Sequence, residues 1–264
     1  MIKGSIVALI TPFHEDGSVN FEKLGELLEW HIANSTDGIL VLGTTGESTT
    51  MTHEEDDAVV EFTMKTVNHR VPVIAGSGSN DTKTMLEKSR KYADLGVDAL
   101  LVITPYYNKA NEEGMIRHFT TVADNVSAPL ILYNVPGRTG CSLSVSAVER
   151  LSKHPNIIGI KEASGNISYA VSVSRFVNEN FAMYSGNDDM VANWMEGKQK
   201  EALGIQQKYL DYIHALFCEV NPIPVKEALN AMGCAVGGYR LPLYEMAEAN
   251  KQKLYAEMKK VGLL

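Results

Sequence analysis

The chain has 264 residues, of which 45% are hydrophobic and 21% are charged, and its formal net charge at pH 7 is −8. This length allows a sizeable buried core and suits a single α/β barrel. The acidic balance, without any cluster of Lys and Arg, argues against nucleic acid or an anionic membrane as a partner.

Several features of the sequence favour the cytoplasm. Cys141, Cys218 and Cys234 form no C-x-x-C pair, which favours reduced thiols over disulfides or a zinc site. The first apolar run, residues 6–10, is too short for the core of a signal peptide. No run approaches the ~18 apolar residues that a membrane span needs. We therefore expect a soluble cytoplasmic protein.

Short apolar segments alternate with amphipathic helical ones along the first two thirds of the chain. The apolar segments recur roughly every 30 residues, which is the length of a strand–helix unit. This pattern favours a TIM-type (β/α) barrel over a doubly wound sheet, whose Gly-x-Gly-x-x-Gly turn is not found. Asp81 and Asn111 precede helical patterns and are predicted to be N-caps. The predicted strands are residues 5–11, 38–42, 72–75, 99–104, 129–134, 157–161 and 182–185.

Seven strands are evident, whereas a closed barrel has eight. After the seventh, the chain runs through Asn187-Asp188-Asp189 into helical patterns at residues 191–196 and 199–217. Pro222 and Pro224 break this pattern, and two further helices are predicted at residues 225–232 and 242–260. We therefore predict a barrel over residues 1–190 that is incomplete at the eighth strand, and a C-terminal helical region over residues 191–264.

The sixth predicted strand ends in Lys161, at a position where burial disfavours the ammonium form. A desolvated lysine amine forms Schiff bases with carbonyl substrates. The alternative is that Lys161 only forms an ion pair with a carboxylate such as Glu162. The residues at the other strand ends have to decide between these two interpretations.

Polar residues follow the other strands where a barrel gathers its reacting groups. Thr44 and Thr45 lie between two glycines after the second strand, and such a turn either binds a small anion or caps the next helix. Tyr133 ends the fifth strand, and Arg138 follows it as either a carboxylate-binding group or a partner in a surface ion pair. Gly186 follows the seventh strand and allows close approach of a substrate, while Asp188 is a possible helix cap.

The fourth strand ends in Tyr106 and Tyr107, for which packing is the simpler interpretation. The histidines are scattered, so no metal site is predicted, and there is no Gly-x-Ser-x-Gly elbow of a serine hydrolase. Condensation of an enamine with an aldehyde would need such a set of groups on one face: a lysine, a tyrosine, two threonine hydroxyls and an arginine.

These motifs resemble those of the dihydrodipicolinate synthase family, which belongs to the pyruvate-dependent class I aldolase and N-acetylneuraminate lyase superfamily. The resemblance covers about residues 6–189 and continues from about residue 191 to the end. The Thr44-Thr45 pair and Arg138 favour the synthase over the lyase. The motifs are Gly43-Thr44-Thr45-Gly46-Glu47, Thr104-Pro105-Tyr106-Tyr107, Tyr133-Asn134-Val135-Pro136-Gly137-Arg138-Thr139, Gly159-Ile160-Lys161-Glu162 and Asn221-Pro222-Ile223-Pro224-Val225-Lys226.

The resemblance implies a lyase that condenses pyruvate with L-aspartate 4-semialdehyde to give 4-hydroxy-tetrahydrodipicolinate, the precursor of diaminopimelate and lysine. Lys161 would form the imine with pyruvate, so that no cofactor is needed, and Tyr133 would donate and accept protons. Thr44 would link Tyr133 to Tyr107, which in the family reaches into the site of a neighbouring subunit and so implies a homotetramer built of dimers.

The resemblance also implies which residues bind the two carboxylates. Thr45 would hold the carboxylate of pyruvate, and Arg138 would receive that of L-aspartate semialdehyde near Gly186. The alternatives are an aldolase acting on another 2-keto sugar acid and a catalytically impaired or non-catalytic relative, because about thirty residues around the eighth strand are absent.

A second departure concerns feedback by lysine. In lysine-inhibited members of the family the effector binds near the positions of Ser48, Thr49, His53, Asn80 and Tyr106. Those members tend to have histidine and glutamate where this chain has Asp56 and Thr84. The resemblance therefore implies weak or absent inhibition by lysine.

Overall fold

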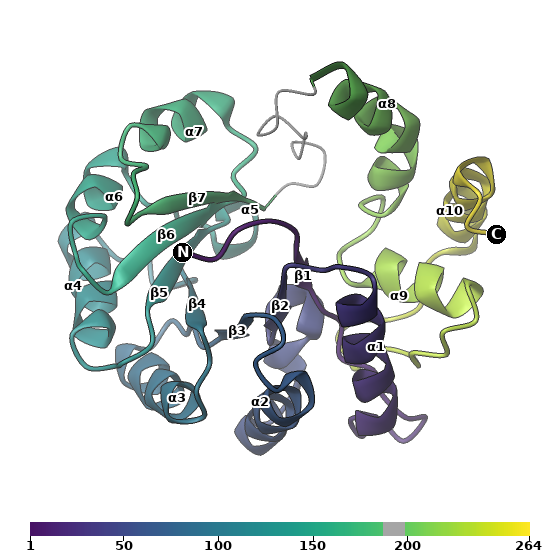
Figure 1. Cartoon of the computed structure of the whole chain (residues 1–264), viewed down its shortest axis with the longest axis horizontal. Coiled ribbons are helices and arrows are strands. Elements are labelled where there is room, and N and C mark those ends of the chain that lie inside the picture. Colours follow the sequence, from purple (N-terminus) through teal and green to yellow (C-terminus); the bar gives the residue numbers. More distant parts are fainter. Residues whose placement is uncertain (187–198) are drawn as a thin grey trace.

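The computed structural model describes residues 1–186 and 199–264. Its centre is one parallel sheet whose strands follow the order of the sequence from β1 to β7. The sheet is curled, and helices cover its outer face (Figure 1). The strands are β1 (Ile6–Ala8), β2 (Gly38–Val41), β3 (Val73–Gly76), β4 (Ala99–Ile103), β5 (Leu130–Asn134), β6 (Ile157–Glu162) and β7 (Ala182–Ser185).

The helices begin where the sequence provides capping groups. Asp81 accepts a hydrogen bond from the backbone N–H of Thr84, and Asn111 accepts one from Gly114, so both predicted N-caps are confirmed. The helices are α1 (Phe21–Ala33), α2 (His53–Val67), α3 (Thr82–Asp94), α4 (Glu112–Ala123), α5 (Pro136–Thr139), α6 (Val145–Leu151), α7 (Ile167–Ser174), α8 (Gln199–Ala215), α9 (Ile223–Ala231) and α10 (Glu248–Val261), and the 3-10 turns are η1 (Thr44–Gly46) and η2 (Ser48–Thr50).

The strands from β2 to β5 are buried on both faces, which explains why they read as continuous apolar runs. At the ends of the sheet, β1 is half-buried, and β7 alternates between half-buried and exposed residues. The inner face packs Leu40, Ile74, Leu101, Ile131 and Tyr133 into one cluster. The outer face contributes to the larger cluster that it shares with the surrounding helices. The predicted class, a TIM-type barrel with seven strands, is confirmed for the described residues.

Several predicted boundaries were wrong by a few residues. The strand predicted at residues 5–11 is limited to Ile6–Ala8, and the helix predicted at 199–217 ends at Ala215. The helix predicted at 242–260 begins only at Glu248 and runs to Val261. The pattern at residues 191–196, the residues Asn187, Asp188 and Asp189, and the predicted domain boundary after residue 190 lie outside the described residues.

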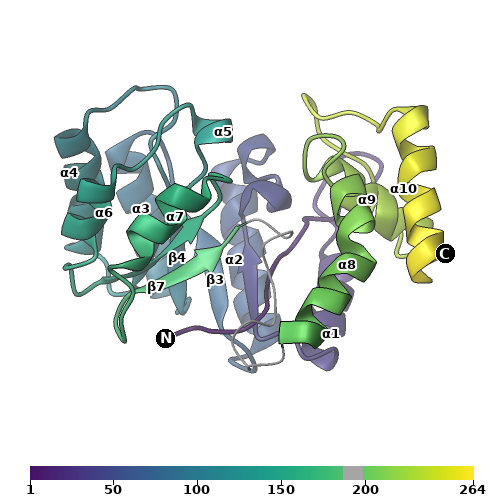
Figure 2. The same ribbon diagram turned by 90° about the horizontal axis from the view of Figure 1, so that it is seen from above.

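The C-terminal helices have a small apolar core of their own, formed by residues of α8, α9, α10 and the segment before α10. Arg240 connects this region to the barrel. Its guanidinium forms an ion pair with Glu55 at 2.5 Å, donates to the carbonyl oxygens of Gly17 and Thr50, and lies 4.5 Å from the centre of the Phe13 ring. Figure 2 shows these helices beside the barrel on the side of α1.

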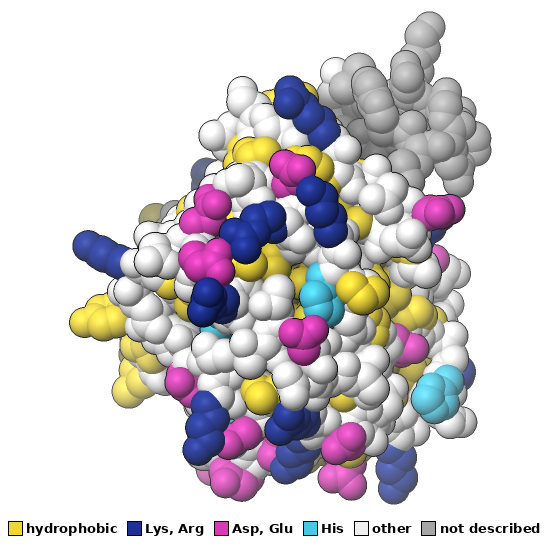
Figure 3. Space-filling view, turned by 90° about the vertical axis from the view of Figure 1, so that its left-hand side faces the viewer, with side chains coloured by type: hydrophobic (Ala, Val, Ile, Leu, Met, Phe, Trp, Pro, Cys, Tyr) yellow, Lys and Arg dark blue, Asp and Glu magenta, His cyan; other side chains and the backbone are white. Residues whose placement is uncertain are grey.

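The outer side of α4 and α6 carries both signs of charge (Figure 3). Glu113 pairs there with Arg117 on its own helix and with Arg150 on α6. Basic and acidic side chains are thus interspersed on this face. Within residues 1–186 and 199–264, none of the helices combines the length and the apolar character needed to cross a bilayer.

Candidate active site

Lys161 and Tyr133 lie side by side on the inner face of the sheet. They are register partners on β6 and β5, and the Lys161 Nζ atom lies 4.7 Å from the centre of the Tyr133 ring. Adjacent residues of a strand point to opposite faces, so Glu162 faces outward. Its carboxylate accepts hydrogen bonds from the Asn134 side chain at 2.8 Å and from the backbone N–H of Ser164 at 2.7 Å.

Tyr133 is enclosed, with 8% of its surface exposed. Burial raises the pKa of its phenol, because removal from water disfavours the charged phenolate. The positive charge of Arg138 and hydrogen bonding with the Thr44 side chain act in the opposite direction on this pKa. Thr44 and Arg138, two of the predicted site residues, are therefore each close enough to Tyr133 to influence its pKa.

The turn that carries the two threonines is rigidly held. Gly46 N–H and Glu47 N–H close the 3-10 turn by donating to the carbonyl oxygens of Gly43 and Thr44. The first N–H groups of such a turn are not used by its own bonds, so those of Thr44 and Thr45 can serve an anion. The next helix is capped by Thr52 instead. The alternative interpretation of the turn as a helix cap is therefore not supported.

Asn221 joins two of the predicted site residues, a connection that motif reasoning did not assign. Its side-chain amide donates to the Thr45 hydroxyl at 2.7 Å, and its backbone carbonyl accepts from Arg138 at 3.3 Å. Arg138 itself is exposed on α5 and is available to a ligand. The segment before α9 thus contacts both Thr45 and Arg138, the two residues predicted to bind the carboxylates of the substrates.

A second connection was also missed: Glu47 and Lys226 form an ion pair in which both side chains are fully buried. Lys226 also donates to the carbonyl oxygen of Gly238 at 2.9 Å and lies 4.2 Å from the centre of the Phe13 ring. Burial lowers the pKa of the Lys226 amine, and the nearby Glu47 carboxylate opposes this change. The pair fixes α9 beneath the turn that carries Thr44 and Thr45.

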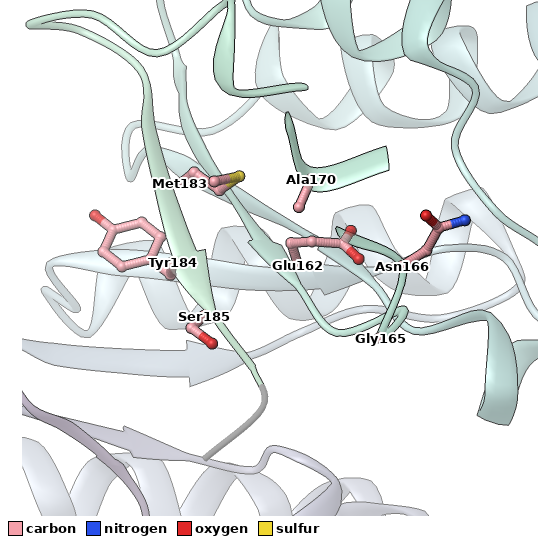
Figure 4. Close-up of a pocket in the computed structure, with 7 residues that line it drawn as sticks. All are labelled: Glu162, Gly165, Asn166, Ala170, Met183, Tyr184 and Ser185. Atoms are coloured by element: carbon pink, nitrogen blue, oxygen red, sulfur yellow. The ribbon is translucent and has the colours of Figure 1, made fainter. Parts of the chain in front are cut away.

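Gly186 lies beside the predicted nucleophile. A Cβ atom at this position would be 3.1 Å from Cε of Lys161 and 2.7 Å from Cβ of Ala163, so only glycine fits without a shift. A cavity of about 210 Å³ lies beside β7. Figure 4 shows the residues that line it. Because Glu162 and Met183 line it there, this cavity lies behind the sheet and away from Lys161.

Tyr107 is separate from the other site residues in the single chain. Its side chain is 90% exposed, and its backbone has a φ of 70°. Tyr106, the residue before it, is partly buried. The side chain of Asn108 in the same turn donates to the carbonyl oxygen of Asn80 at 2.6 Å, which brings the loops after β3 and β4 together.

The remaining predicted effector residues lie at the start of α2. Ser48 and Thr49 belong to η2, and His53 is the first residue of α2. The Ser48 hydroxyl donates to Asp56 at 2.9 Å, and the Lys88 amine forms an ion pair with the same carboxylate oxygen at 2.7 Å. An internal ammonium group therefore lies against the carboxylate of Asp56.

The described residues bring an amine, a phenol, a turn with free N–H groups and a guanidinium to the carboxyl ends of the strands. An amine can form an imine with a ketone, and a neighbouring phenol can transfer the protons. The N–H groups and the guanidinium can bind carboxylates. Residues 1–186 and 199–264 contain no group of three or more His, Cys, Asp and Glu that could hold a metal ion.

Comparison with known proteins gives one consistent result. The model described as the dihydrodipicolinate synthetase family matches residues 1–196 and 189–261. The 4-hydroxy-tetrahydrodipicolinate synthase of Alkaliphilus oremlandii (strain OhILAs) is 44% identical over 291 aligned positions that cover 100% of both chains. Since this chain has 264 residues, about 27 positions of that alignment hold no residue of it.

Two solved structures show the same similarity in three dimensions. The chloride-inhibited dihydrodipicolinate synthase of Acinetobacter baumannii in complex with pyruvate has a TM-score of 0.96 and 38% identity, and the match covers 100% of both chains. A structure described as the first monomeric dihydrodipicolinate synthase variant has a TM-score of 0.95 and 31% identity, covering 100% of this chain and 98% of that one. The match to the family model and the motifs at the strand ends agree, and the chain belongs to the dihydrodipicolinate synthase family.

Proposed function

We propose that this protein condenses pyruvate with L-aspartate 4-semialdehyde to give 4-hydroxy-tetrahydrodipicolinate. The observation that carries the proposal is the amine of Lys161 beside the phenol of Tyr133 on the inner face of the sheet. Membership of the family supports it, as does the name of the relative from Alkaliphilus oremlandii.

The amine of Lys161 attacks the ketone of pyruvate, and loss of water leaves an imine. The protonated imine withdraws electrons, so the methyl group loses a proton and an enamine forms. The enamine carbon attacks the aldehyde and becomes bonded to a carbon that carries the new hydroxyl. The amino group of the aldehyde substrate then replaces Lys161 at the imine carbon, which closes the ring and frees the enzyme. One water is lost overall, and no cofactor is required.

Tyr133 is proposed to move the protons in these steps. Its raised pKa keeps the phenol protonated at neutral pH, so that it can donate to the leaving hydroxyl of the first adduct. Thr44, which hydrogen bonds with it, gives the proton a path away from the imine. Tyr133 acts here as the catalytic acid and base, and Thr44 as its relay.

The two carboxylates are proposed to bind at the two groups that Asn221 connects. The N–H groups and the hydroxyl of Thr45 would hold pyruvate, because the turn leaves its first N–H groups free. Arg138 would bind the carboxylate of the aldehyde with its fork of donors, close to Gly186. A polyol substrate has no carboxylate at that end, so Arg138 favours this reaction over an aldolase of sugar acids.

The reaction is tested by supplying pyruvate and L-aspartate semialdehyde and following the formation of the cyclic product. We expect product with both substrates and none when either is omitted. Arg138→Met should raise the KM for the aldehyde at least tenfold and leave the KM for pyruvate nearly unchanged, because a charge-assisted bidentate bond is lost at one substrate only. Equal changes in both KM values would contradict the assigned role of Arg138.

We also propose a homotetramer built of dimers, located in the cytoplasm. The exposure of Tyr107 supports the assembly, since an exposed side chain is available to the site of a neighbouring subunit. The three free thiols support the location.

The effector residues are proposed to bind lysine weakly or not at all. Asp56 is 2% exposed and already pairs with Lys88 and Ser48, so no free carboxylate is offered there to the ammonium group of an added lysine. Titration with L-lysine under turnover should therefore give little inhibition. Half-inhibition well below millimolar lysine would show that this interpretation is wrong.

A further inference from the structure

The sheet has two ends, β1 and β7, and within the described residues these ends do not pair with each other. Among the described residues, only β7 lies between the lysine on β6 and the side of the barrel where β7 and β1 do not pair, which is called here the open side. A closed barrel would shield this side with another strand. The question is what covers the inner face of β6 and β7 beside Lys161.

Tyr184 on β7 occupies the inner layer next to Lys161. The two residues are register partners, so Tyr133, Lys161 and Tyr184 form one row across three strands. Figure 4 shows the Tyr184 ring on the side of β7 opposite to Met183. A Cβ atom at Gly159 would lie 2.9 Å from the Tyr184 ring, so the ring covers the inward position below Lys161 on the same strand.

The hydroxyl of Tyr184 connects to the beginning of the chain. It donates to the carbonyl oxygen of Ile2 at 2.9 Å, a contact between residues 182 positions apart. The Ile2 side chain packs with Tyr184 and Ile6 against the inner cluster of the barrel. In Figure 1 the chain runs from its amino terminus, close to β6 and β7, across to β1.

The other end of this segment is fixed on the far side of the opening. The backbone N–H of Ser5 donates to the Asp37 carboxylate at 2.7 Å, and the N–H of Asp37 donates to the Ser5 carbonyl at 2.9 Å. Gly4 has a φ of 89°, and a Cβ atom there would lie 2.1 Å from the Asp37 carboxylate, so only glycine permits this contact. Residues 1–5 are thus attached to β7 at one end and to the start of β2 at the other.

We propose that residues 1–5 and Tyr184 together cover the open side of the barrel beneath Lys161, and that Tyr184 is a positioning residue for this lysine. Tyr184 lies beside Lys161 in this row, and the Ile2 side chain packs on the same inner cluster, so both limit the access of water to the amine from this side. Keeping water out favours the neutral amine, which is the form that attacks a ketone. The inference rests on the proposed Schiff-base function of Lys161.

The test uses the full-length protein and three variants: Tyr184→Phe, deletion of residues 2–4, and the two changes combined. Borohydride traps the imine of pyruvate, and the rate of trapping is measured over a range of pH. Loss of one net hydrogen bond should slow trapping at neutral pH about fivefold. Admission of water should also move the pH of half-maximal trapping upward, which a purely structural loss would not do.

The matched control is Tyr169→Phe. The Tyr169 hydroxyl is also buried, on the neighbouring α7, but makes no hydrogen bond among the described residues. We expect the control to behave like the unaltered protein. The combined variant should be no slower than the slower single variant, because both changes remove the same contact.

Three outcomes separate this inference from the proposed function. If the unaltered protein is trapped at Lys161 but Tyr184→Phe and the deletion leave rate and pH midpoint unchanged, the inference is wrong and the function stands. The inference is also wrong if the two single changes slow trapping independently, so that their effects multiply in the combined variant. If the unaltered protein is not trapped, the proposed function is wrong, and amide hydrogen exchange then tests the contact between Tyr184 and Ile2. Amide exchange at β7 should increase equally in both single variants. Unchanged exchange at β7 would refute the inference.

Discussion

Tyr133 and Lys161 lie side by side, as the proposed proton donor and the proposed nucleophile would have to. The phenol is buried, its pKa is raised, and the lysine amine lies against its ring. Tyr133→Phe keeps the ring and removes only the proton donor. We expect kcat to fall about 100-fold or more, which is the usual contribution of general acid–base catalysis.

The pH dependence of the unaltered protein has a defined direction, which Tyr133→Phe should lack. Because burial raises the pKa of the Tyr133 phenol from its ordinary value, the phenol remains protonated through neutral pH. Its ionisation should therefore appear only as a loss of activity at strongly alkaline pH. Steady-state kinetics over pH 6 to 11 measure this limb, and an unchanged kcat in Tyr133→Phe would exclude the residue as the proton donor.

At the scale of single residues, the sequence predicted the reactive groups at the ends of the strands but not the residues that hold them in place. Lys161 and Tyr133 could be found because register brings neighbouring strand ends together. Asn221 reaches Thr45 across 176 positions, and Lys226 reaches Glu47 inside the core. Such contacts depend on how the C-terminal helices pack, which no local pattern specifies.

Among the elements, α9 has the most direct influence on the site. Its Lys226 pairs with Glu47 directly after the turn of Thr44 and Thr45. Lys226→Met would leave the Glu47 carboxylate buried and unpaired, and breaking such a pair costs about 3–5 kcal/mol. Urea unfolding should show this loss, together with a higher KM for pyruvate.

Lys153→Met is the matched control, because Lys153, just after α6, forms an exposed pair with Glu149 of that helix. Such pairs contribute little to stability. The double variant Glu47→Gln/Lys226→Met should recover part of the lost stability, since no charge is then left buried. If Lys226→Met unfolds at the same urea concentration as the control, the buried pair does not anchor α9.

Element boundaries followed the sequence where caps or buried runs define them. The strand at Ala182–Ser185 was predicted at its observed position, and so were the two caps at Asp81 and Asn111. The last helix begins six residues later than predicted, at Glu248, because the segment before it packs Met246 into the C-terminal core and sends Arg240 to the barrel. Tertiary contacts outweigh the helical pattern there.

For the whole molecule, the position of Tyr107 predicts that each site needs two subunits. Tyr107→Phe and Lys161→Ala should each be nearly inactive alone. In a mixed dimer, the subunit with Tyr107→Phe keeps its lysine and receives an intact tyrosine from the Lys161→Ala subunit. Refolding the two variants together should therefore restore up to a quarter of normal activity per subunit, since about half of random dimers are mixed and have one complete site.

Activity assays on the refolded mixture, with light scattering to measure its mass, check this prediction. The control is a mixture of Lys161→Ala with Tyr133→Phe/Lys161→Ala, in which no subunit has the nucleophile. A monomeric mass with normal activity in the unaltered protein would contradict the shared site.

The proposed function depends on an amine at position 161 that reacts with a keto acid, in a barrel whose described part has seven strands. The most direct test is borohydride reduction in the presence of pyruvate, followed by peptide mass spectrometry. The account predicts a reduced pyruvate adduct on the peptide that contains Lys161 and no adduct in Lys161→Ala. Absence of an adduct, or its appearance on another lysine, would contradict it.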